Sequence, residues 1–138
     1  MSKKTCFVNG CFDVLHVGHI KLFEFCKKQS DWLIVAIDSD ERISDAKGKN
    51  RPINNLSDRA YFLESISYVD KVLSFSSDEE LESLVKNISP EIMVVGSDWR
   101  EKEVIGGKHA EELIFFDRIG NYSTTNILKG KISWATYL

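Results

Sequence analysis

The sequence has few of the features that mark secreted, membrane-spanning or nucleic-acid-binding proteins. It contains only three cysteines, Cys6, Cys11 and Cys26, and their spacing matches neither a disulfide framework nor a zinc site. No stretch approaches the roughly 18 apolar residues that a bilayer-spanning helix needs, and the first residues lack the pattern of a signal peptide. We therefore expect a cytoplasmic protein that has no membrane partner.

An excess of charge of one sign is also missing. The chain has 18 Lys and Arg residues against 21 Asp and Glu residues, which gives a formal net charge of -3. Binding to a nucleic-acid backbone usually needs a clustered excess of basic residues, so we expect no nucleic-acid partner, although a small anionic ligand is compatible with this composition. With 43% hydrophobic residues among 138, the chain has the composition of a globular protein. We expect a single domain that spans residues 1–138.

Short apolar runs alternate with helix-like segments along the chain. Strands are predicted over residues 5–9, 32–37, 71–75, 92–95 and 113–116. Helices are predicted over residues 18–28 and 78–89, and from Ser57 and Ser123 onward. The alternation predicts an α/β fold, a Rossmann-like parallel five-stranded sheet with helices on both faces. Such sheets bind ligands at the carboxyl ends of their strands, so the loops after the first and fourth strands are the candidate sites.

Between the second and third predicted strands, we expect a loop and one helix. The second strand ends in a polar cluster at residues 38–40, residues 47–55 are expected to form a loop that contains lysine and glycine, and no element is assigned between them. In the helix from Ser57, the expected buried positions are apolar: Ala60, Leu63 and Ile66.

Two histidines stand three residues apart in the loop after the first strand. His16 and His19 flank Gly18, and if Gly18 and His19 open a helix, both imidazoles and free backbone N–H groups can face one anion. Glycine permits close approach to a phosphate, and two donors stabilise negative charge that grows on a phosphoryl group. A single histidine in a small domain is more often an ordinary core or surface residue, so it is the spacing that favours a function. A metal site is disfavoured, because the only other histidine is His109 and no carboxylate or thiol flanks the pair at ligand spacing.

The same loop carries a complete motif. Residues 10–19, Gly-Cys-Phe-Asp-Val-Leu-His-Val-Gly-His, match the pattern G-x-F-D-x-x-H-x-G-H. The sequence here resembles the cytidylyltransferase-like nucleotidyltransferases, which include glycerol-3-phosphate cytidylyltransferase and the heptose-1-phosphate adenylyltransferase domain. The resemblance covers residues 8 to about 132 and includes residues 47–49, 68–70, 96–99 and 123–125. It implies in-line attack of an acceptor phosphate on the α-phosphorus of a nucleoside triphosphate, with pyrophosphate as the leaving group.

The resemblance implies roles for residues along the whole chain. The expected catalytic residues are His16, His19, Lys47 and Arg118. The expected nucleotide-binding residues are Gly10, Cys11, Phe12, Asp13, Gly18, Lys49, Gly96, Asp98, Trp99, Ser123, Thr124 and Thr125. The expected acceptor-binding residues are Lys47 and Asp38. Mg²⁺ is the expected cofactor, bound mainly through the triphosphate, and no protein ligand is assigned to it.

Several of these residues also have an ordinary structural explanation. Lys47 and Lys49 suit the donor and acceptor phosphates, yet a lysine pair is also common on a solvated loop. Residues 123–125 offer hydroxyl and N–H groups to phosphates, or they are simply a helix N-cap. Trp99 either forms a wall of the nucleotide site or packs on its loop, and Asp13 either orients the motif or helps to position a Mg²⁺-bound triphosphate.

The nucleotide and the acceptor are the least determined part of the function. Arg118 and the short segment before it resemble glycerol-3-phosphate cytidylyltransferase, which favours CTP. Ser67 stands where cytidylyltransferases usually carry arginine, and residues 104–106 and 123–127 are similar to the heptose-phosphate adenylyltransferases, which favours ATP. Because Arg59 could replace the missing arginine, we rank CMP transfer from CTP to glycerol 3-phosphate or a similar polyol phosphate first. ATP with a heptose phosphate is the alternative.

Two further interpretations come from other classes of protein. A non-catalytic nucleotide-binding regulator could keep this fold, because a fold alone does not define a function. However, a degenerate copy is expected to lose the histidine motif and the loop lysines, and both are present. A flavodoxin-like binder is weaker still, because the loop after the first strand lacks a Ser/Thr-rich phosphate cradle. Related cytidylyltransferases are commonly dimers, so we also expect a homodimer.

Overall fold

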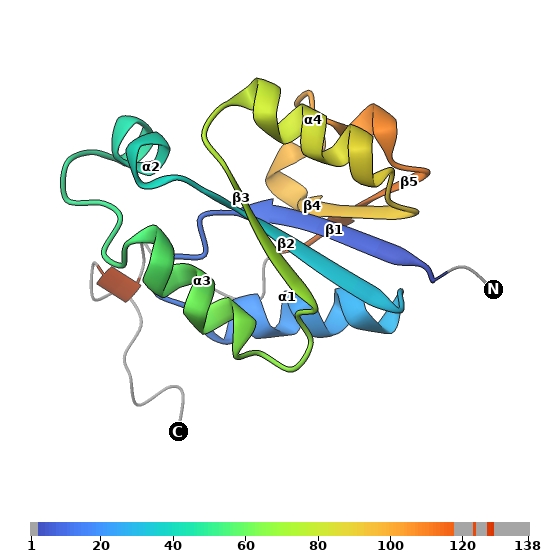
Figure 1. Cartoon of the computed structure of the whole chain (residues 1–138), viewed down its shortest axis with the longest axis horizontal. Coiled ribbons are helices and arrows are strands. Elements are labelled where there is room, and N and C mark those ends of the chain that lie inside the picture. Colours follow the sequence, from blue (N-terminus) through green and yellow to red (C-terminus); the bar gives the residue numbers. More distant parts are fainter. Residues whose placement is uncertain (1–2, 118–122, 124–126, 129–138) are drawn as a thin grey trace.

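The computed structural model describes residues 3–117, 123, 127 and 128, and they form a parallel sheet with helices on both faces (Figure 1). The strands are β1 (Thr5–Gly10), β2 (Trp32–Asp38), β3 (Lys71–Phe75), β4 (Ile92–Gly96) and β5 (Glu112–Phe116). Their spatial order is β3-β2-β1-β4-β5, and every neighbouring pair is parallel. The predicted Rossmann-like α/β fold is therefore confirmed, with all five strands close to their predicted positions.

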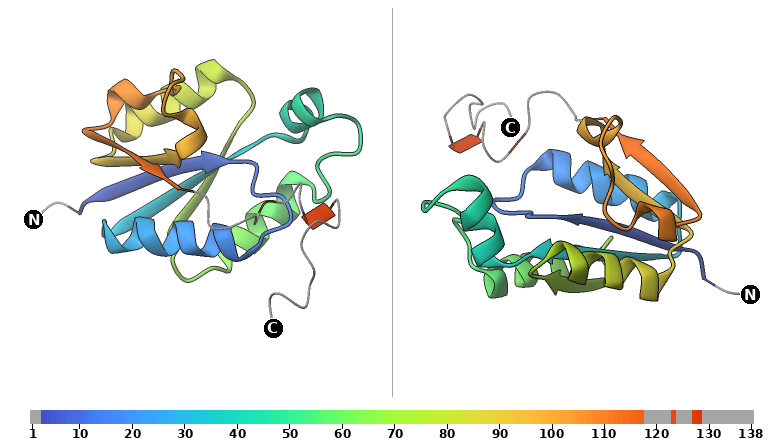
Figure 2. Two further views of the ribbon diagram at one scale, coloured as in Figure 1. Left: turned by 180° about the vertical axis from the view of Figure 1, so that it is seen from behind. Right: turned by 90° about the horizontal axis from the view of Figure 1, so that it is seen from above.

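Three of the four α-helices in the described part of the chain cover the two faces of the sheet, and the fourth lies at its edge. Three longer helices cover the sheet: α1 (Val17–Lys28), α3 (Leu56–Glu64) and α4 (Asp78–Ile88). Helices α1 and α3 lie on one face, and α4 lies on the other, while α2 (Asp40–Lys47) stands beyond the carboxyl end of β2 (Figures 1 and 2). Two short 3₁₀ helices, η1 (Ser97–Trp99) and η2 (Gly107–His109), lie between β4 and β5. This arrangement leaves the carboxyl ends of the strands free of the covering helices.

The side chains of the central strands pack alternately against the helices on the two faces of the sheet. Successive side chains of a strand point to opposite faces, and parallel strands that are covered on both faces are apolar at nearly every position. One row of paired residues packs with α4: Phe7, Ile34 and Met93. The next row packs with α1 and α3: Val8, Val35 and Val94. The sheet therefore stands between two apolar clusters, and this fixes the strand ends that carry the candidate site.

Helix α2 was not predicted, and α3 begins earlier than predicted. Ser39 caps α2 by accepting a hydrogen bond from the backbone N–H of Arg42 at 3.3 Å, and Ile43 is the one buried side chain of this helix. Asn55, not Ser57, caps α3, with its side chain accepting from the backbone N–H of Asp58 at 2.9 Å. A helix with one buried apolar residue gives almost no periodic signal, and only its cap marked it.

The predicted buried face of α3 is partly wrong. Leu63 is fully buried as expected, but Ala60 and Ile66 are only partly buried at the edge of the cluster. The other fully buried residue of α3 is the charged Arg59, with 0% of its surface exposed. A buried guanidinium needs hydrogen-bond partners, and these partners lie in the loops that form the candidate site.

The switch point of the sheet lies between β1 and β4. The chain runs from β1 outward through β2 to β3 and then returns to the other side of β1 as β4. The loops that follow β1 and β4 therefore leave the sheet side by side in opposite directions, and this is where open parallel sheets bind ligands. None of the described helices is long and apolar enough to cross a membrane.

Gly106 lies where the chain before η2 passes close to α4. Its φ is +79°, and a Cβ atom at this position would lie 2.8 Å from Cγ2 of Val85. Gly48 also has a positive φ, +102°, but a Cβ atom there would meet nothing within 4 Å. A substitution at Gly48 would therefore introduce backbone strain alone, whereas a substitution at Gly106 would introduce backbone strain and a steric overlap with Val85.

We expect Gly106→Ala to lower the free energy of unfolding by about 3 kcal/mol, because left-handed strain and overpacking against Val85 add together. Gly48→Ala is the matched control, and we expect it to cost only roughly 1 kcal/mol of backbone strain. Urea unfolding followed by circular dichroism measures both values. Equal destabilisation by the two substitutions would contradict the contact with α4.

Candidate active site

A cavity of about 360 Å³ lies at the switch point. Its wall consists of Asn9, Gly10, Cys11, Asp38, Arg42, Lys47, Leu81, Val95, Gly96, Trp99, Val104 and Ile105. Six of these residues were predicted as site residues: Gly10, Cys11, Asp38, Lys47, Gly96 and Trp99. The fold thus brings together the ends of β1, β2 and β4 with α2 and residues 99–105, as expected for ligand binding at the carboxyl edge of the sheet.

The two histidines of the motif cap the start of α1. His16 is the N-cap residue, and its Nδ1 accepts a hydrogen bond from the backbone N–H of Gly18 at 3.0 Å. Nδ1 of His19 accepts in return from the backbone N–H of His16 at 3.1 Å, and the two rings stack with their centroids 3.8 Å apart. This is a reciprocal capping box in which imidazoles replace the usual hydroxyl and carboxylate groups. The spacing of three residues is therefore a requirement of the helix start.

The capping geometry fixes the tautomer of both rings. An Nδ1 atom that accepts a hydrogen bond carries no proton, so the neutral ring of each histidine carries its proton on Nε2. Each ring can then donate through Nε2–H. The expectation of free backbone N–H groups beside the imidazoles is wrong at Gly18 and His16, because those two groups already donate to the rings.

Burial keeps His19 neutral. Its pKa is lowered from the ordinary value of 6.5 to about 3, first because the ring is buried and then because His16 and Lys47 are close. Phe12 supplies part of this burial, since its ring packs edge-on against His19 with centroids 5.3 Å apart. Lys47 lines the cavity, but His16 and His19 are not themselves among the residues of its wall.

Asp13 holds the motif loop to another part of the chain. It is 1% exposed, and its carboxylate accepts from the backbone N–H groups of Ile53 and Asn54 at 2.7 and 2.9 Å. Nε of Arg51 lies 3.3 Å from the same carboxylate. Of the two roles predicted for Asp13, these contacts support the orientation of the loop.

Arg59 joins the loops around the cavity from below. Its Nη1 donates to the carbonyl oxygens of Cys11 and Asp38 at 3.1 and 2.8 Å, and its Nε donates to that of Asn54 at 3.0 Å. Its Nη2 pairs with Asp40 at 2.6 Å. The hypothesis that Arg59 replaces a nucleotide-binding arginine is therefore wrong, because this guanidinium is fully buried and binds the protein itself.

The segment around Ser67 lies far from the cavity. The carboxylate of Asp70 accepts from the backbone N–H of Leu33 at 2.8 Å, near the beginning of β2. Residues 67–70 therefore lie at the amino edge of the sheet, whereas the cavity lies at the carboxyl edge. Within one chain, the residue at position 67 does not contact the cavity.

The remaining predicted site residues lie in different places relative to the cavity. Lys47 is the last residue of α2, not a loop residue, and it lines the cavity. The predicted site residues that the structure describes but that are absent from the lining are Phe12, Asp13, His16, Gly18, His19, Lys49, Asp98 and Ser123. Phe12 is buried between His19 and Phe23, so it supports the motif from inside. The carbonyl of Ser123 accepts from the backbone N–H of Ile127 at 3.0 Å, as in the start of a helix. Arg118, Thr124 and Thr125 lie outside the described residues.

Arg42 is a cavity residue that the sequence analysis missed. Its Nε donates to Asp38 at 2.7 Å, and its Nη2 pairs with Asp78 of α4 at 2.5 Å. The spacing of four residues between Asp38 and Arg42 is the only sequence signal of this pair, and it becomes visible only once α2 is recognised.

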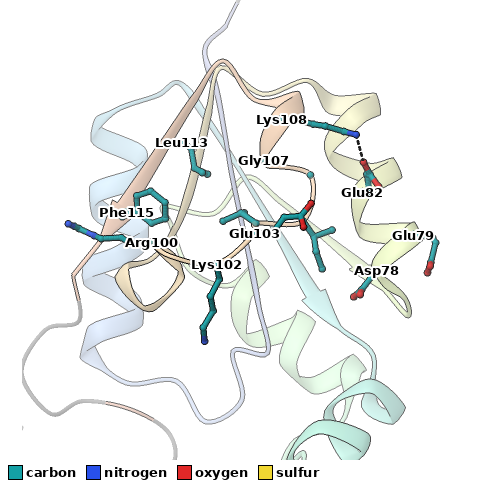
Figure 3. A pocket seen from close by; sticks show the side chains of 13 residues that line it. Asp78, Glu79, Glu82, Arg100, Lys102, Glu103, Gly107, Lys108, Leu113 and Phe115 are labelled. Atoms are coloured by element: carbon teal, nitrogen blue, oxygen red, sulfur yellow. Dashed lines mark ion pairs between the residues drawn. The ribbon is translucent and has the colours of Figure 1, made fainter.

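A second cavity, of about 480 Å³, lies beside α4 and residues 100–108 (Figure 3). Its charged lining residues are Asp78, Glu79, Glu82, Arg100, Lys102, Glu103 and Lys108. Glu82 pairs with Lys108 at 3.4 Å, and this pairing lowers the pKa of the carboxyl group. None of the predicted site residues that the structure describes lines this cavity. Val104 and Ile105 line both cavities and so separate them.

Comparison with known proteins matches one family model and several relatives. The model described as Cytidylyltransferase-like matches residues 7–129. The bifunctional protein HldE of Helicobacter hepaticus is 44% identical over 126 residues, which are 91% of this chain and 26% of that protein. The HldE protein of Aliarcobacter butzleri is 43% identical over 129 residues, which are 94% of this chain and 27% of that protein. The chain thus spans about a quarter of the length of these relatives.

Two solved structures are also similar. The lipopolysaccharide core biosynthesis protein from Thermoplasma volcanium superposes with a TM-score of 0.67 at 25% identity, over 88% of this chain and 100% of that chain. A pantothenate synthetase from Thermus thermophilus superposes with a TM-score of 0.64 at 13% identity, over 96% of this chain and 63% of that chain. The second likeness is one of fold alone.

We expect the ring of His19 to stay neutral in the folded protein between pH 8 and pH 5, because its pKa is about 3. In the urea-unfolded chain, the same ring should titrate near its ordinary value of 6.5. The unfolded chain then binds a proton that the folded chain does not, so the contribution of His19 to stability falls as the pH drops from 6.5 towards 3. Imidazole chemical shifts measured by NMR against pH check this, and a folded-state midpoint near 6.5 would refute the buried neutral ring.

Proposed function

Because the chain belongs to the cytidylyltransferase-like family, we propose that it is a nucleotidyltransferase that transfers AMP from ATP to a sugar phosphate and releases pyrophosphate. The observation that carries this proposal is the pair of stacked imidazoles at the start of α1, whose Nδ1 atoms accept backbone hydrogen bonds and so leave the proton of each neutral ring on Nε2. Lys47, a cation that lines the cavity, is close enough to His19 to lower the pKa of its ring. Neutral donors and a nearby cation are the groups that a phosphoryl-transfer transition state needs.

The proposed reaction is a single displacement at the α-phosphorus. An oxygen of the acceptor phosphate forms a bond to that phosphorus while the bond to the bridging oxygen of the pyrophosphate breaks, so no covalent intermediate with the protein is needed. His16 and His19 donate through Nε2–H to oxygens of the α-phosphoryl group, where negative charge increases. Lys47 reduces the repulsion between the two phosphorylated substrates.

Mg²⁺ is proposed to arrive with the triphosphate, where it would neutralise charge on the pyrophosphate that leaves. Among residues 3–117 and the three described residues beyond them, no group of three or more His, Cys, Asp or Glu side chains could hold a metal ion. Asp13, the carboxylate of the motif, is already bound to the backbone of Ile53 and Asn54. The available donors thus fit a metal ion carried by phosphate oxygens.

The choice of ATP over CTP reverses the ranking made from the sequence. That ranking depended on Arg59 as a substitute for a missing arginine, and Arg59 is bound to protein carbonyls instead. The similarity to HldE proteins favours the heptose-phosphate adenylyltransferase alternative. The Thermoplasma volcanium protein is named for lipopolysaccharide core biosynthesis, which favours a sugar phosphate over glycerol 3-phosphate as the acceptor. The homodimer expected from the resemblance stays a prediction.

A pyrophosphate-release screen tests the two substrates together. ATP and CTP are each combined with hexose 1-phosphates, heptose 1-phosphates and glycerol 3-phosphate in the presence of Mg²⁺. We expect ATP with a sugar phosphate to give the highest kcat/KM. Turnover confined to CTP with glycerol 3-phosphate would restore the first-ranked alternative, and nucleotide binding without any pyrophosphate release would identify a non-catalytic regulator.

The imidazoles are tested by substitution. We expect His16→Ala and His19→Ala each to lower kcat by roughly 10²–10³-fold, the usual effect of removing one charge-stabilising donor. Because both rings also cap α1, the loss of about 1 kcal/mol of stability is expected as well. His16→Ser is the variant that separates the two effects, since serine restores the cap but has no donor at the position of Nε2.

His109 provides the matched control for these variants. It lies outside the cavity and contacts Glu82 at 3.4 Å. His109→Ala should keep nearly the turnover of the natural protein. Recovery of turnover in His16→Ser would show that the imidazole acts only as a helix cap.

A further inference from the structure

We propose that Ser44 and Arg51 are positioning residues, which tie the end of α2 that carries Lys47 to the loop of the histidine motif. The tie is made by residues 48–54, which we call the strap. This inference rests on the proposed nucleotidyl transfer and adds two residues that act through others, since neither Ser44 nor Arg51 lines the cavity.

Helix α2 needs external support at its carboxyl end. It has only eight residues, and Ile43 is its one buried side chain. Its ion pairs, made by Asp40 and Arg42, lie at the beginning of the helix. Lys47 is the last residue and is exposed, so packing against the core does not fix its position. The contacts that hold this end of the helix come from the chain that follows it.

The strap begins with a closed turn at the end of α2. The backbone N–H of Gly48 donates to the carbonyl oxygen of Ser44 at 2.8 Å, and the hydroxyl group of Ser44 donates to the carbonyl oxygen of Arg51 at 2.7 Å. The backbone N–H of Arg51 donates to the carbonyl oxygen of Gly48 at 3.1 Å. Both backbone polar groups of Arg51 are therefore bound to residues that stand on either side of Lys47.

The strap is bound to the motif loop through Asp13. The carboxylate of Asp13 accepts from the backbone N–H groups of Ile53 and Asn54, and it also pairs with Nε of Arg51 at 3.3 Å. The side chains of Arg51 and Asp13 are 11% and 0% exposed. Because Asp13 precedes His16 by three residues, the strap connects the end of α2 with the loop that caps α1.

Arg51 is bound less completely than a purely stabilising arginine would be. Its Nη2 atom is buried and finds no hydrogen-bond partner in the described part of the chain. Arg59, in contrast, makes hydrogen bonds through Nε, Nη1 and Nη2. A buried N–H group without an acceptor costs stability, so the presence of Arg51 here indicates a functional role for its contact with Asp13.

The strap determines the distance between Lys47 and the imidazoles. Lys47 is close enough to His19 to contribute to the lowered pKa of that ring. In the proposed reaction, the lysine and the imidazoles act on one phosphoryl transfer. A displacement of about 1 Å can lower the rate of such a step by about 10²-fold. Loss of the strap therefore lowers the rate of the chemical step more than the affinity for the nucleotide.

Steady-state kinetics of the full chain, with the substrates identified by the pyrophosphate-release screen, test this role. We expect Ser44→Ala and Arg51→Ala each to lower kcat about tenfold or more and to leave the KM of the nucleotide within about twofold. Ser44→Thr keeps the hydroxyl group, and Arg51→Lys keeps a cation beside Asp13, so both should recover most of kcat. The double variant should lose no more than the stronger single variant, because both substitutions break the same tie. Additive losses, or a raised KM at unchanged kcat, would overturn the proposal.

Ser30→Ala is the matched control. The hydroxyl group of Ser30 donates to the carbonyl oxygen of Cys26 at 2.8 Å, so this variant loses the same kind of hydrogen bond at the opposite edge of the sheet. Its kcat should equal that of the natural protein. Urea unfolding shows whether each variant is folded in the assay. Ser44→Ala keeps the test decisive if Arg51→Ala, which removes the counter-charge of buried Asp13, fails to fold.

Hydrogen exchange of the ligand-free chain tests the tie without turnover. The backbone N–H groups of His16 and Gly18 are bound to the imidazoles of the cap. We expect Ser44→Ala, a change on α2, to make both amides exchange about threefold faster or more, and Ser30→Ala to leave them unchanged. Faster exchange without pyrophosphate release by the natural protein would refute the nucleotidyl transfer alone. Unchanged exchange of both amides in Ser44→Ala would show that the strap does not tie α2 to the motif loop.

Discussion

The site depends on one buried cation. Arg59 projects from α3 into the space beneath the strand ends, where its guanidinium binds the carbonyl oxygens of Cys11, Asp38 and Asn54 and the carboxylate of Asp40. A buried charge of this kind is tolerated only when most of its hydrogen bonds are made. The loop after β1, the end of β2 and the segment before α3 therefore have to meet at one point. Asp13 adds a second tie between the first and the last of these segments.

Much of the fold and part of the site could be predicted from the sequence. The strands are short runs of apolar residues, and the motif of residues 10–19 follows the first of them, so its location at the carboxyl edge followed from topology. Helix α2 escaped prediction because only Ile43 anchors it. The burial of Arg59 could not be inferred either, since arginine is normally exposed and its partners are backbone carbonyls, which carry no sequence signal. The orientation of the two imidazoles likewise depends on the local geometry of the backbone.

The two cavities show how the molecule separates different electrostatic environments. The cavity at the switch point is lined by Lys47, by the ion pair of Asp38 and Arg42, and by apolar side chains that include Leu81, Val95 and Val104. The cavity beside α4 carries charges of both signs, several of which are already paired (Figure 3). Of the two, only the first includes the ends of the central strands β1 and β4. A cavity with charged and apolar lining at the strand ends fits the nucleotide of the proposed reaction, which has an aromatic base and a charged phosphate chain.

The reciprocal cap at the start of α1 has a consequence for how the protein acquires activity during folding. The first turn of this helix is closed by the same ring nitrogens that determine where the opposite ring edges point. A molecule in which α1 has formed already has both donors aligned, so the alignment needs no separate ordering step and loses no additional entropy when a ligand arrives. Secondary structure formation and the pre-organisation of a reaction centre are, in this loop, a single event.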